Sequence, residues 1–143
     1  DDEDVLLVAK HMFDPFEYLM LRHKGNLLNT DFKKPLGKVA YHAACHQRVQ
    51  RIGSKTSDIL KLAGAEVTQI NRCSGHDGTY AVKKEFAKFA VKIGKPVATR
   101  VNQAGAEYYT SDCAMAGHHI AAISGDGSQT LHPMTLLRMA YAI

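Results

Sequence analysis

Residues 66–93 of the chain read EVTQINRCSGHDGTYAVKKEFAKFAVKI, and this stretch decides the fold class. Its first five residues, 66–70, predict a β-strand. Residues 80–93 predict a helix whose apolar face comprises Val82, Phe86, Phe89, Ala90 and Ile93, ended by a glycine and a proline. A strand, a short loop and a helix form the repeating unit of parallel α/β sheets.

The same order of elements continues on both sides of this stretch. Further strands are predicted at residues 38–41 and 107–110, and further helices at 54–63, 96–104, 115–123 and 133–142. Two helices are predicted before residue 24, and a connector follows them. We therefore predict an α/β domain at residues 38–143, with a parallel sheet of about three to four strands flanked by helices. Residues 1–37 are predicted to form an N-terminal helical extension and connector.

Composition places the chain among ordinary globular domains. It has 143 residues, of which 45% are hydrophobic and 22% charged, and its three cysteines cannot form a complete set of internal disulfides. The net charge is +4, but the basic residues are scattered and no nucleic-acid motif is present, so we expect no nucleic-acid partner. The longest apolar stretch, Val5 to Ala9, is too short to span a membrane. We expect a cytoplasmic protein and, because no initiator methionine opens the chain, the C-terminal part of a longer one.

The three cysteines occupy equivalent positions in the predicted fold. Cys45, Cys73 and Cys113 each follow a predicted strand, and the carboxyl ends of parallel strands meet at one edge of a sheet. Thiolates with imidazoles are ligands for zinc, iron and iron–sulfur clusters. No Cys-x-x-Cys pair is present, and the alternative for each thiol is a small buried side chain.

The loop after the second predicted strand contains residues that could stabilise or activate the Cys73 thiolate. Gly75 and Gly78 allow close backbone approach, and the N–H groups of the loop and of the following helix favour negative charge on sulfur. Cys73, His76 and Asp77 also include the residue types of a nucleophilic thiol site. His42 is interpreted as a hydrogen-bonded core residue.

Four stretches together resemble a known family. They are YHAACH at 41–46, RCSGHDGTY at 72–80, SDCAMAG at 111–117 and HPMTLL at 132–137. They look like the cysteine-rich CCG domain of the heterodisulfide reductase B subunit. Similar proteins include the C subunit of anaerobic glycerol-3-phosphate dehydrogenase and the iron–sulfur subunit of glycolate oxidase.

The family pattern is one cysteine, then a Cys-Cys-Gly, then a Cys-x-x-Cys. Cys45 matches the first of these, Cys73 the first of the pair, and Cys113 the first of the final motif. Ser74 and Ala116 stand where the family has its other two cysteines.

The resemblance implies a 4Fe–4S cluster on the three cysteines, with the fourth iron site open or bound by another group. A zinc ion with a histidine ligand is the alternative cofactor. His76 is the first choice for that histidine because it lies three residues after Cys73, and His46 and His118 are the second choices. Ser74, Gly75 and Gly78 are predicted to line the cofactor.

The function implied by the resemblance is electron transfer. The expected partners are a flavin-containing dehydrogenase subunit and a membrane quinone-side component, which would hold the chain peripherally at the inner face of the cell membrane. Two other functions remain open. One is a scaffold domain for subunit assembly that binds zinc or no metal, and the other is an enzyme with a nucleophilic thiol.

Overall fold

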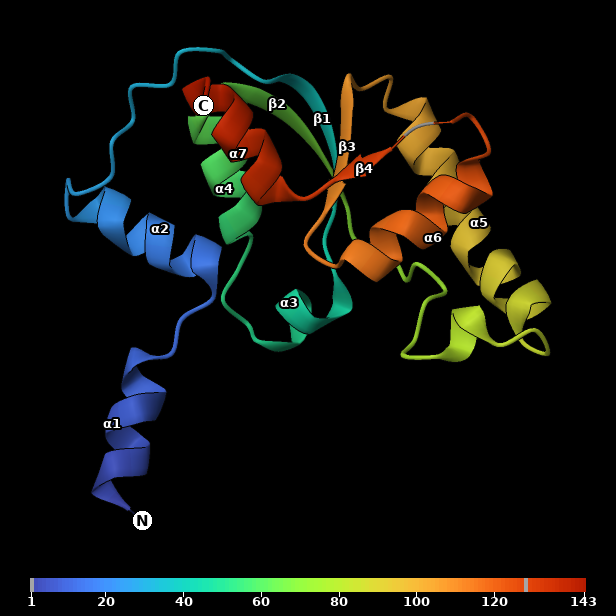
Figure 1. The fold of residues 1–143 in the computed structure, drawn as a ribbon, viewed down its shortest axis with the longest axis horizontal. Coiled ribbons are helices and arrows are strands. Elements are labelled where there is room, and N and C mark those ends of the chain that lie inside the picture. The colour runs from blue at the N-terminus through green and yellow to red at the C-terminus, as the bar shows by residue number, and fades with distance from the viewer. Residues whose placement is uncertain (1, 128) are drawn as a thin grey trace.

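A four-stranded parallel sheet forms the centre of the computed structural model, which describes residues 2–127 and 129–143 (Figure 1). The strand order is β2-β1-β3-β4, and every neighbouring pair is parallel. The strands are β1 (Gly37–His42), β2 (Ala65–Ile70), β3 (Tyr108–Ser111) and β4 (Thr130–Leu131). The predicted α/β class and parallel sheet are confirmed, and β4 is a short strand that the sequence pattern missed.

Helices cover both faces of this sheet. The helices of the chain are α1 (Glu3–His11), α2 (Pro15–Lys24), α3 (Cys45–Val49), α4 (Lys55–Leu62), α5 (Ala87–Gln103), α6 (Ala114–Ser124) and α7 (Pro133–Tyr141), with a short 3-10 helix, η1, at Tyr80–Val82. In Figure 1, α4 and α7 lie on one side of the sheet and α5 and α6 on the other. The short helix α3 follows β1 directly and was not predicted.

The central strand β1 separates two hydrophobic cores. Val39 packs in one core with Ile59 of α4 and Leu136 of α7, while Ala40 packs in the other with Val97 of α5 and Ile120 of α6. Successive side chains of a strand point to opposite faces, which explains this division. Residues 39–42 are all buried, as expected for a strand that helices cover on both faces.

The register aligns the carboxyl ends of three strands. His42 at the end of β1 lies opposite Ile70 of β2 on one side and Ser111 of β3 on the other. The loops that carry the three cysteines therefore leave the sheet at the same level.

The predicted helices at 80–93 and 96–104 are one continuous helix that begins later. Residues 80–82 form η1, and α5 then runs from Ala87 through Gly94 and Pro96 to Gln103. Proline inside a helix removes one hydrogen bond and glycine weakens it. Packing of Val97 and Val101 into the core offsets these costs.

The apolar face predicted for this helix was also wrong. Of the five residues chosen, only Ala90 is buried, whereas Val82, Phe86, Phe89 and Ile93 are exposed. The buried residues of α5 are Ala90, Gly94, Val97, Ala98 and Val101. Their small size lets α5 approach its neighbours closely, which a pattern based on large apolar residues does not detect.

The N-terminal helices differ in how they join the body. Phe16 of α2 is buried in the same core as Leu136, whereas α1 has no buried residue and projects away from the rest of the chain in Figure 1. The division at residue 37 stays a prediction, although Phe16 belongs to the same core as the sheet.

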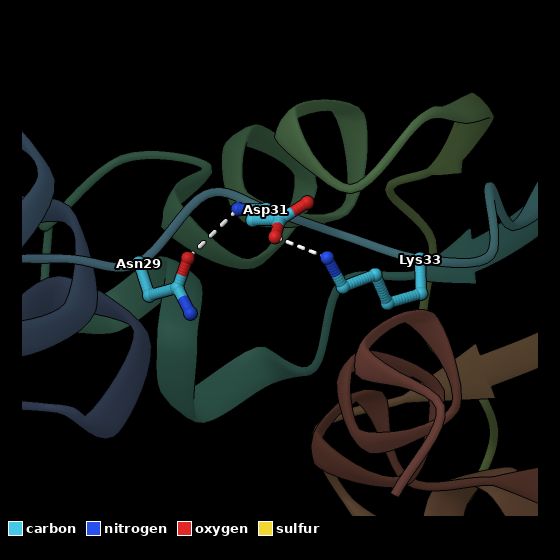
Figure 2. Close-up of polar contacts among 3 residues, drawn as sticks. All are labelled: Asn29, Asp31 and Lys33. Carbon is cyan, nitrogen blue, oxygen red and sulfur yellow. Dashed lines mark hydrogen bonds and ion pairs between the residues drawn. The ribbon is translucent and has the colours of Figure 1, made fainter.

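The connector after α2 is held by local and long-range polar contacts. The Asp31 backbone N–H donates to Asn29 Oδ1 at 2.9 Å, and the Lys33 ammonium group pairs with the Asp31 carboxylate (Figure 2). This exposed ion pair contributes little to stability. The Tyr141 hydroxyl donates to the Asn29 carbonyl at 2.5 Å, and the Lys34 N–H donates to the carbonyl of Ala140. These bonds fasten the connector to α7.

Within the described residues, no helix has the length and apolarity needed to cross a membrane.

Gly94 provides a test of the continuous helix α5. A Cβ at residue 94 would lie 2.5 Å from the Ser74 carbonyl oxygen and 2.5 Å from Ile123 Cδ1. We expect Gly94→Ala to lower the free energy of unfolding by about 1–3 kcal/mol through overpacking, although alanine favours helix by about 1 kcal/mol. The exposed control Thr99→Ala should be nearly neutral. Urea unfolding of both variants tests this, and a stabilised Gly94→Ala would contradict the packing described.

Candidate functional site

Three cysteines lie at the carboxyl edge of the sheet. Cys45 is the first residue of α3 after β1, Cys73 follows β2, and Cys113 is the N-cap residue of α6 after β3. Since β1 lies between β2 and β3, the Cys45 loop is flanked by the other two. Cys45 and Cys73 are exposed, Cys113 is partly buried, and all three are free thiols. The sequence correctly predicted that these positions share one edge.

Each sulfur atom accepts a hydrogen bond. The Gly75 N–H lies 3.4 Å from Cys73 Sγ, and the Ala116 N–H lies 3.5 Å from Cys113 Sγ. The Arg48 guanidinium donates to Cys45 Sγ at 3.3 Å. Hydrogen bonds to sulfur are among the features that tune iron–sulfur centres.

His42, the last residue of β1, links this strand to the loops that carry Cys73 and Cys113. Its Nε2 lies 2.9 Å from the Arg72 carbonyl oxygen, and its Nδ1 lies 3.0 Å from Ser111 Oγ. A carbonyl oxygen only accepts, so the Nε2 atom carries the proton and the Ser111 hydroxyl donates to Nδ1. Ser111 Oγ in turn accepts the backbone N–H of Cys113 at 3.4 Å. This chain joins β1 to the residue before Cys73 and to Cys113 itself.

The imidazole of His42 is held neutral. Burial lowers its pKa below the ordinary value, and the positive charge of Arg48 lowers the pKa further, while the bond to the Arg72 carbonyl opposes both. The side chain is 1% exposed. The interpretation of His42 as a hydrogen-bonded core residue is confirmed.

A second buried network surrounds the end of β1. Tyr41 Oη lies 2.6 Å from Gln47 Oε1 and 2.5 Å from Asp112 Oδ2. The Gln47 amide donates to Thr56 Oγ1 at 2.7 Å, and the Thr56 hydroxyl donates to Asp112 Oδ1 at 2.8 Å. These four side chains form a closed ring that joins β1, α3, α4 and the residue before Cys113.

The Tyr41 hydroxyl lies between two acceptors of this ring. It donates to Asp112 Oδ2 and is also within hydrogen-bond distance of Gln47 Oε1, so the two acceptors share its one proton. Burial raises the pKa of Asp112 above its ordinary value, although the bonds with Tyr41 and Thr56 counter part of that rise. Burial and the nearby Asp112 raise the pKa of Tyr41 as well.

The three candidate histidines occupy different environments. His76 is partly buried, and its Nε2 atom is buried without a hydrogen-bond partner among the described residues. His46 on α3 and His118 on α6 are exposed. Among the described residues, no hydrogen bond joins Cys73 to His76, so the thiol–imidazole pair of a nucleophilic site is not assembled.

Comparison with known proteins decides the family. The family model of the cysteine-rich domain CCG matches residues 39–121, which include all three cysteines. The chain belongs to the CCG cysteine-rich domain family. It is also 33% identical over 112 residues to the C subunit of anaerobic glycerol-3-phosphate dehydrogenase from Escherichia coli K12, and equally to that of strain O157:H7. The match covers 76% of this chain and 28% of each relative. No solved structure matches the chain.

The two positions where the CCG pattern has lost cysteines are buried beside the remaining ones. Ser74 is 2% exposed and Ala116 is 5% exposed. Gly75 packs against α5, where a Cβ would lie 2.3 Å from the Ala90 carbonyl oxygen, and its φ of +79° favours glycine. Gly78 has open space around it. A cofactor-lining role for Ser74, Gly75 and Gly78 stays a prediction.

The donors of this CCG domain have the right chemistry for a metal but are not assembled into a site. Three thiols and the unpartnered His76 Nε2 suit iron–sulfur clusters or zinc. Across residues 2–127 and 129–143, however, no group of three His, Cys, Asp or Glu side chains is placed to hold a metal ion. Binding of a metal by these three thiols would therefore need side-chain positions other than those described.

Several residues that organise the CCG domain were missed from sequence. Arg48, Tyr41 and Asp112 contact partners that are up to 71 residues away in the chain. The only available signals were a histidine and a tyrosine inside a buried strand and an aspartate directly before Cys113.

The lowered pKa of His42 predicts a pH-dependent stability. In the unfolded chain the imidazole titrates near 6.5, above its pKa in the folded state, so the unfolded chain binds more protons as the pH falls below that value. The contribution of neutral His42 to the free energy of unfolding is fully present above pH 6.5. It decreases as the pH falls toward the folded pKa, by up to about 1.4 kcal/mol per pH unit. Urea unfolding between about pH 7.5 and about pH 5.5 should show a flatter slope for His42→Gln than for the wild type. An unchanged slope in His42→Gln would refute the assignment.

Proposed function

We propose that this CCG domain binds a 4Fe–4S cluster through Cys45, Cys73 and Cys113 and serves as an electron-transfer component of a larger redox complex. The observation that supports this most is the position of three free thiols at the ends of three adjacent parallel strands. A cluster held there would supply one-electron transfer.

The surrounding residues have distinct roles in this proposal. The backbone N–H groups of Gly75 and Ala116 and the guanidinium of Arg48 hydrogen-bond the three sulfurs. His76 is the proposed fourth ligand because its Nε2 atom is buried and unpartnered among the described residues. His46 and His118 are exposed alternatives.

The proposed partners follow from the relatives. The E. coli relatives are named as one subunit of an anaerobic glycerol-3-phosphate dehydrogenase, and the chain spans 28% of their length. We therefore propose a flavin-containing dehydrogenase subunit and a membrane quinone-side component as partners. The domain would lie in the cytoplasm, peripherally at the inner face of the cell membrane.

A scaffold domain that holds zinc or no metal is the second candidate. Two observations favour it, namely the serine and alanine at positions 74 and 116 and the absence of an assembled metal site among the described residues. Zinc needs four ligands in a structural site, and three cysteines with one histidine are a common set.

Iron and acid-labile sulfide analysis of anaerobically purified protein tests the first proposal. We expect iron and sulfide in nearly equal amounts, with both lost in Cys45→Ala, Cys73→Ala and Cys113→Ala, because each removes one of three thiolates. Ser124→Ala, at the far end of α6, should retain the wild-type content. Zinc without sulfide would support the scaffold instead, and a metal-free wild type would contradict both metal-bound forms.

Restoring the family cysteines gives a complementary prediction. Ser74→Cys with Ala116→Cys adds two thiols beside the three present, and we expect iron per chain after reconstitution to rise. The control, Ala121→Cys with Ser124→Cys, adds two thiols in the second half of α6 and should not raise it. If both pairs change the iron content equally, the extra thiols act without regard to position, and the proposed site is wrong.

A further inference from the structure

A polar cavity of about 310 Å³ lies beside the Cys45 loop and is not used by the proposed cluster site. Arg48, which donates to Cys45 Sγ, forms part of its wall. The residues that line it are Gln47, Arg48, Arg51, Gly53, Ser54, Gln69 and Asn71. No carboxylate is among them.

Two cationic side chains, those of Arg48 and Arg51, line this cavity. Lys55 lies near it, with its Nζ atom 3.7 Å from the position that a Cβ on the lining residue Gly53 would take. The ion pair within the described residues is between Lys33 and Asp31, in the connector. The two arginines and the lysine therefore have no carboxylate partner in the part of the chain that the structure describes.

Neutral hydrogen-bond donors complete the wall. Gln69 of β2 donates to Ser54 Oγ at 3.2 Å and to Asn71 Oδ1 at 2.9 Å. Both amide protons of Gln69 are thus used, whereas the Ser54 hydroxyl proton and the Asn71 amide protons remain available. Ser54 is also the N-cap residue of α4 and makes no side-chain bond to the first turn.

Arg51 has a left-handed backbone conformation that glycine adopts more easily than arginine does. Its φ is +56°, a left-handed conformation that costs a residue with a Cβ on the order of 1 kcal/mol or more. In this conformation Arg51 lines the cavity together with Gln69 and Asn71 from the end of β2.

We propose that this cavity binds a phosphate dianion, either free or as the phosphate group of a small phosphorylated molecule. Two guanidinium groups offer paired donors that match tetrahedral oxyanions, and their two positive charges, with Lys55 nearby, favour a dianion over a single carboxylate. The cavity is larger than the phosphate group alone, which leaves room for a small organic part. The proposal does not depend on whether the cysteines hold a metal.

Calorimetric titration of the whole chain with inorganic phosphate at constant ionic strength tests the proposal. We expect saturable binding that Arg48→Gln and Arg51→Gln each weaken at least about tenfold, as for the loss of a charge-assisted hydrogen-bonded contact. The control Arg138→Gln removes the same charge from an exposed site on α7 and should bind as the wild type does. Acetate should bind at least about tenfold more weakly than phosphate.

A third variant separates loss of binding from loss of folding. Arg51→Gly removes the guanidinium and suits the positive φ, so its urea unfolding midpoint should be no lower than that of the wild type while phosphate binding is lost. No saturable phosphate binding by the wild type would overturn the proposal. Equal weakening of phosphate binding by Arg138→Gln would also overturn the proposal, because it would show that phosphate is attracted by the net charge alone. Acetate binding as tight as that of phosphate would refute the preference for a dianion.

Titration with a phosphate monoester distinguishes the two sources of the ligand. Glycerol 2-phosphate is a suitable probe because it carries the same dianion on a small organic part. Tighter binding of this ester than of inorganic phosphate would support a phosphorylated small molecule as the ligand. Weaker binding would support free phosphate and overturn the assignment to an ester.

Discussion

The imidazole of His42 is the contact on which the arrangement of the cysteine loops depends. It stands at the end of the central strand and bonds the loop after β2 through the Arg72 carbonyl and the loop after β3 through Ser111. Because the ring is buried and neutral, both bonds are formed away from water, where an unmet partner is costly. The backbone register sets the level of the loops, and these two bonds add side-chain links from β1 to the Cys73 and Cys113 loops.

The fold and the proposed chemistry are therefore linked at one edge of the sheet. Parallel strands place three loops there, His42 ties two of them to β1, and the Tyr41–Asp112 ring fixes the start of α3. The polar framework is buried while two of the thiols are exposed. A rigid base with accessible sulfurs suits a site that takes up a cofactor or meets a partner. Ser74 and Ala116 supply no thiol, so three cysteines are the sulfur donors at this edge.

The features of the fold that depend on residues near one another in the sequence could be predicted. The strand before each cysteine and the parallel sheet follow from short strand segments that alternate with helices, so the shared edge of Cys45, Cys73 and Cys113 was predictable. Helix α5 was not, because Gly94 and Pro96 are local signals to stop, and tertiary packing overrides them. The hydrogen bonds of His42 to Arg72 and Ser111 and of Tyr41 to Asp112 were also out of reach, since they join residues 30 to 71 positions apart.

The state of the His42 ring tests this account most directly. Long-range nitrogen–proton correlation spectra of the histidine side chains report which ring nitrogen carries the proton and how the ring titrates. We predict a protonated Nε2 and an unprotonated Nδ1 at about pH 7, with a slowly exchanging Nε2 proton and a pKa below the ordinary imidazole value of 6.5. A His42 ring that carries its proton on Nδ1, or whose pKa is 6.5 or higher, would contradict the bonding described.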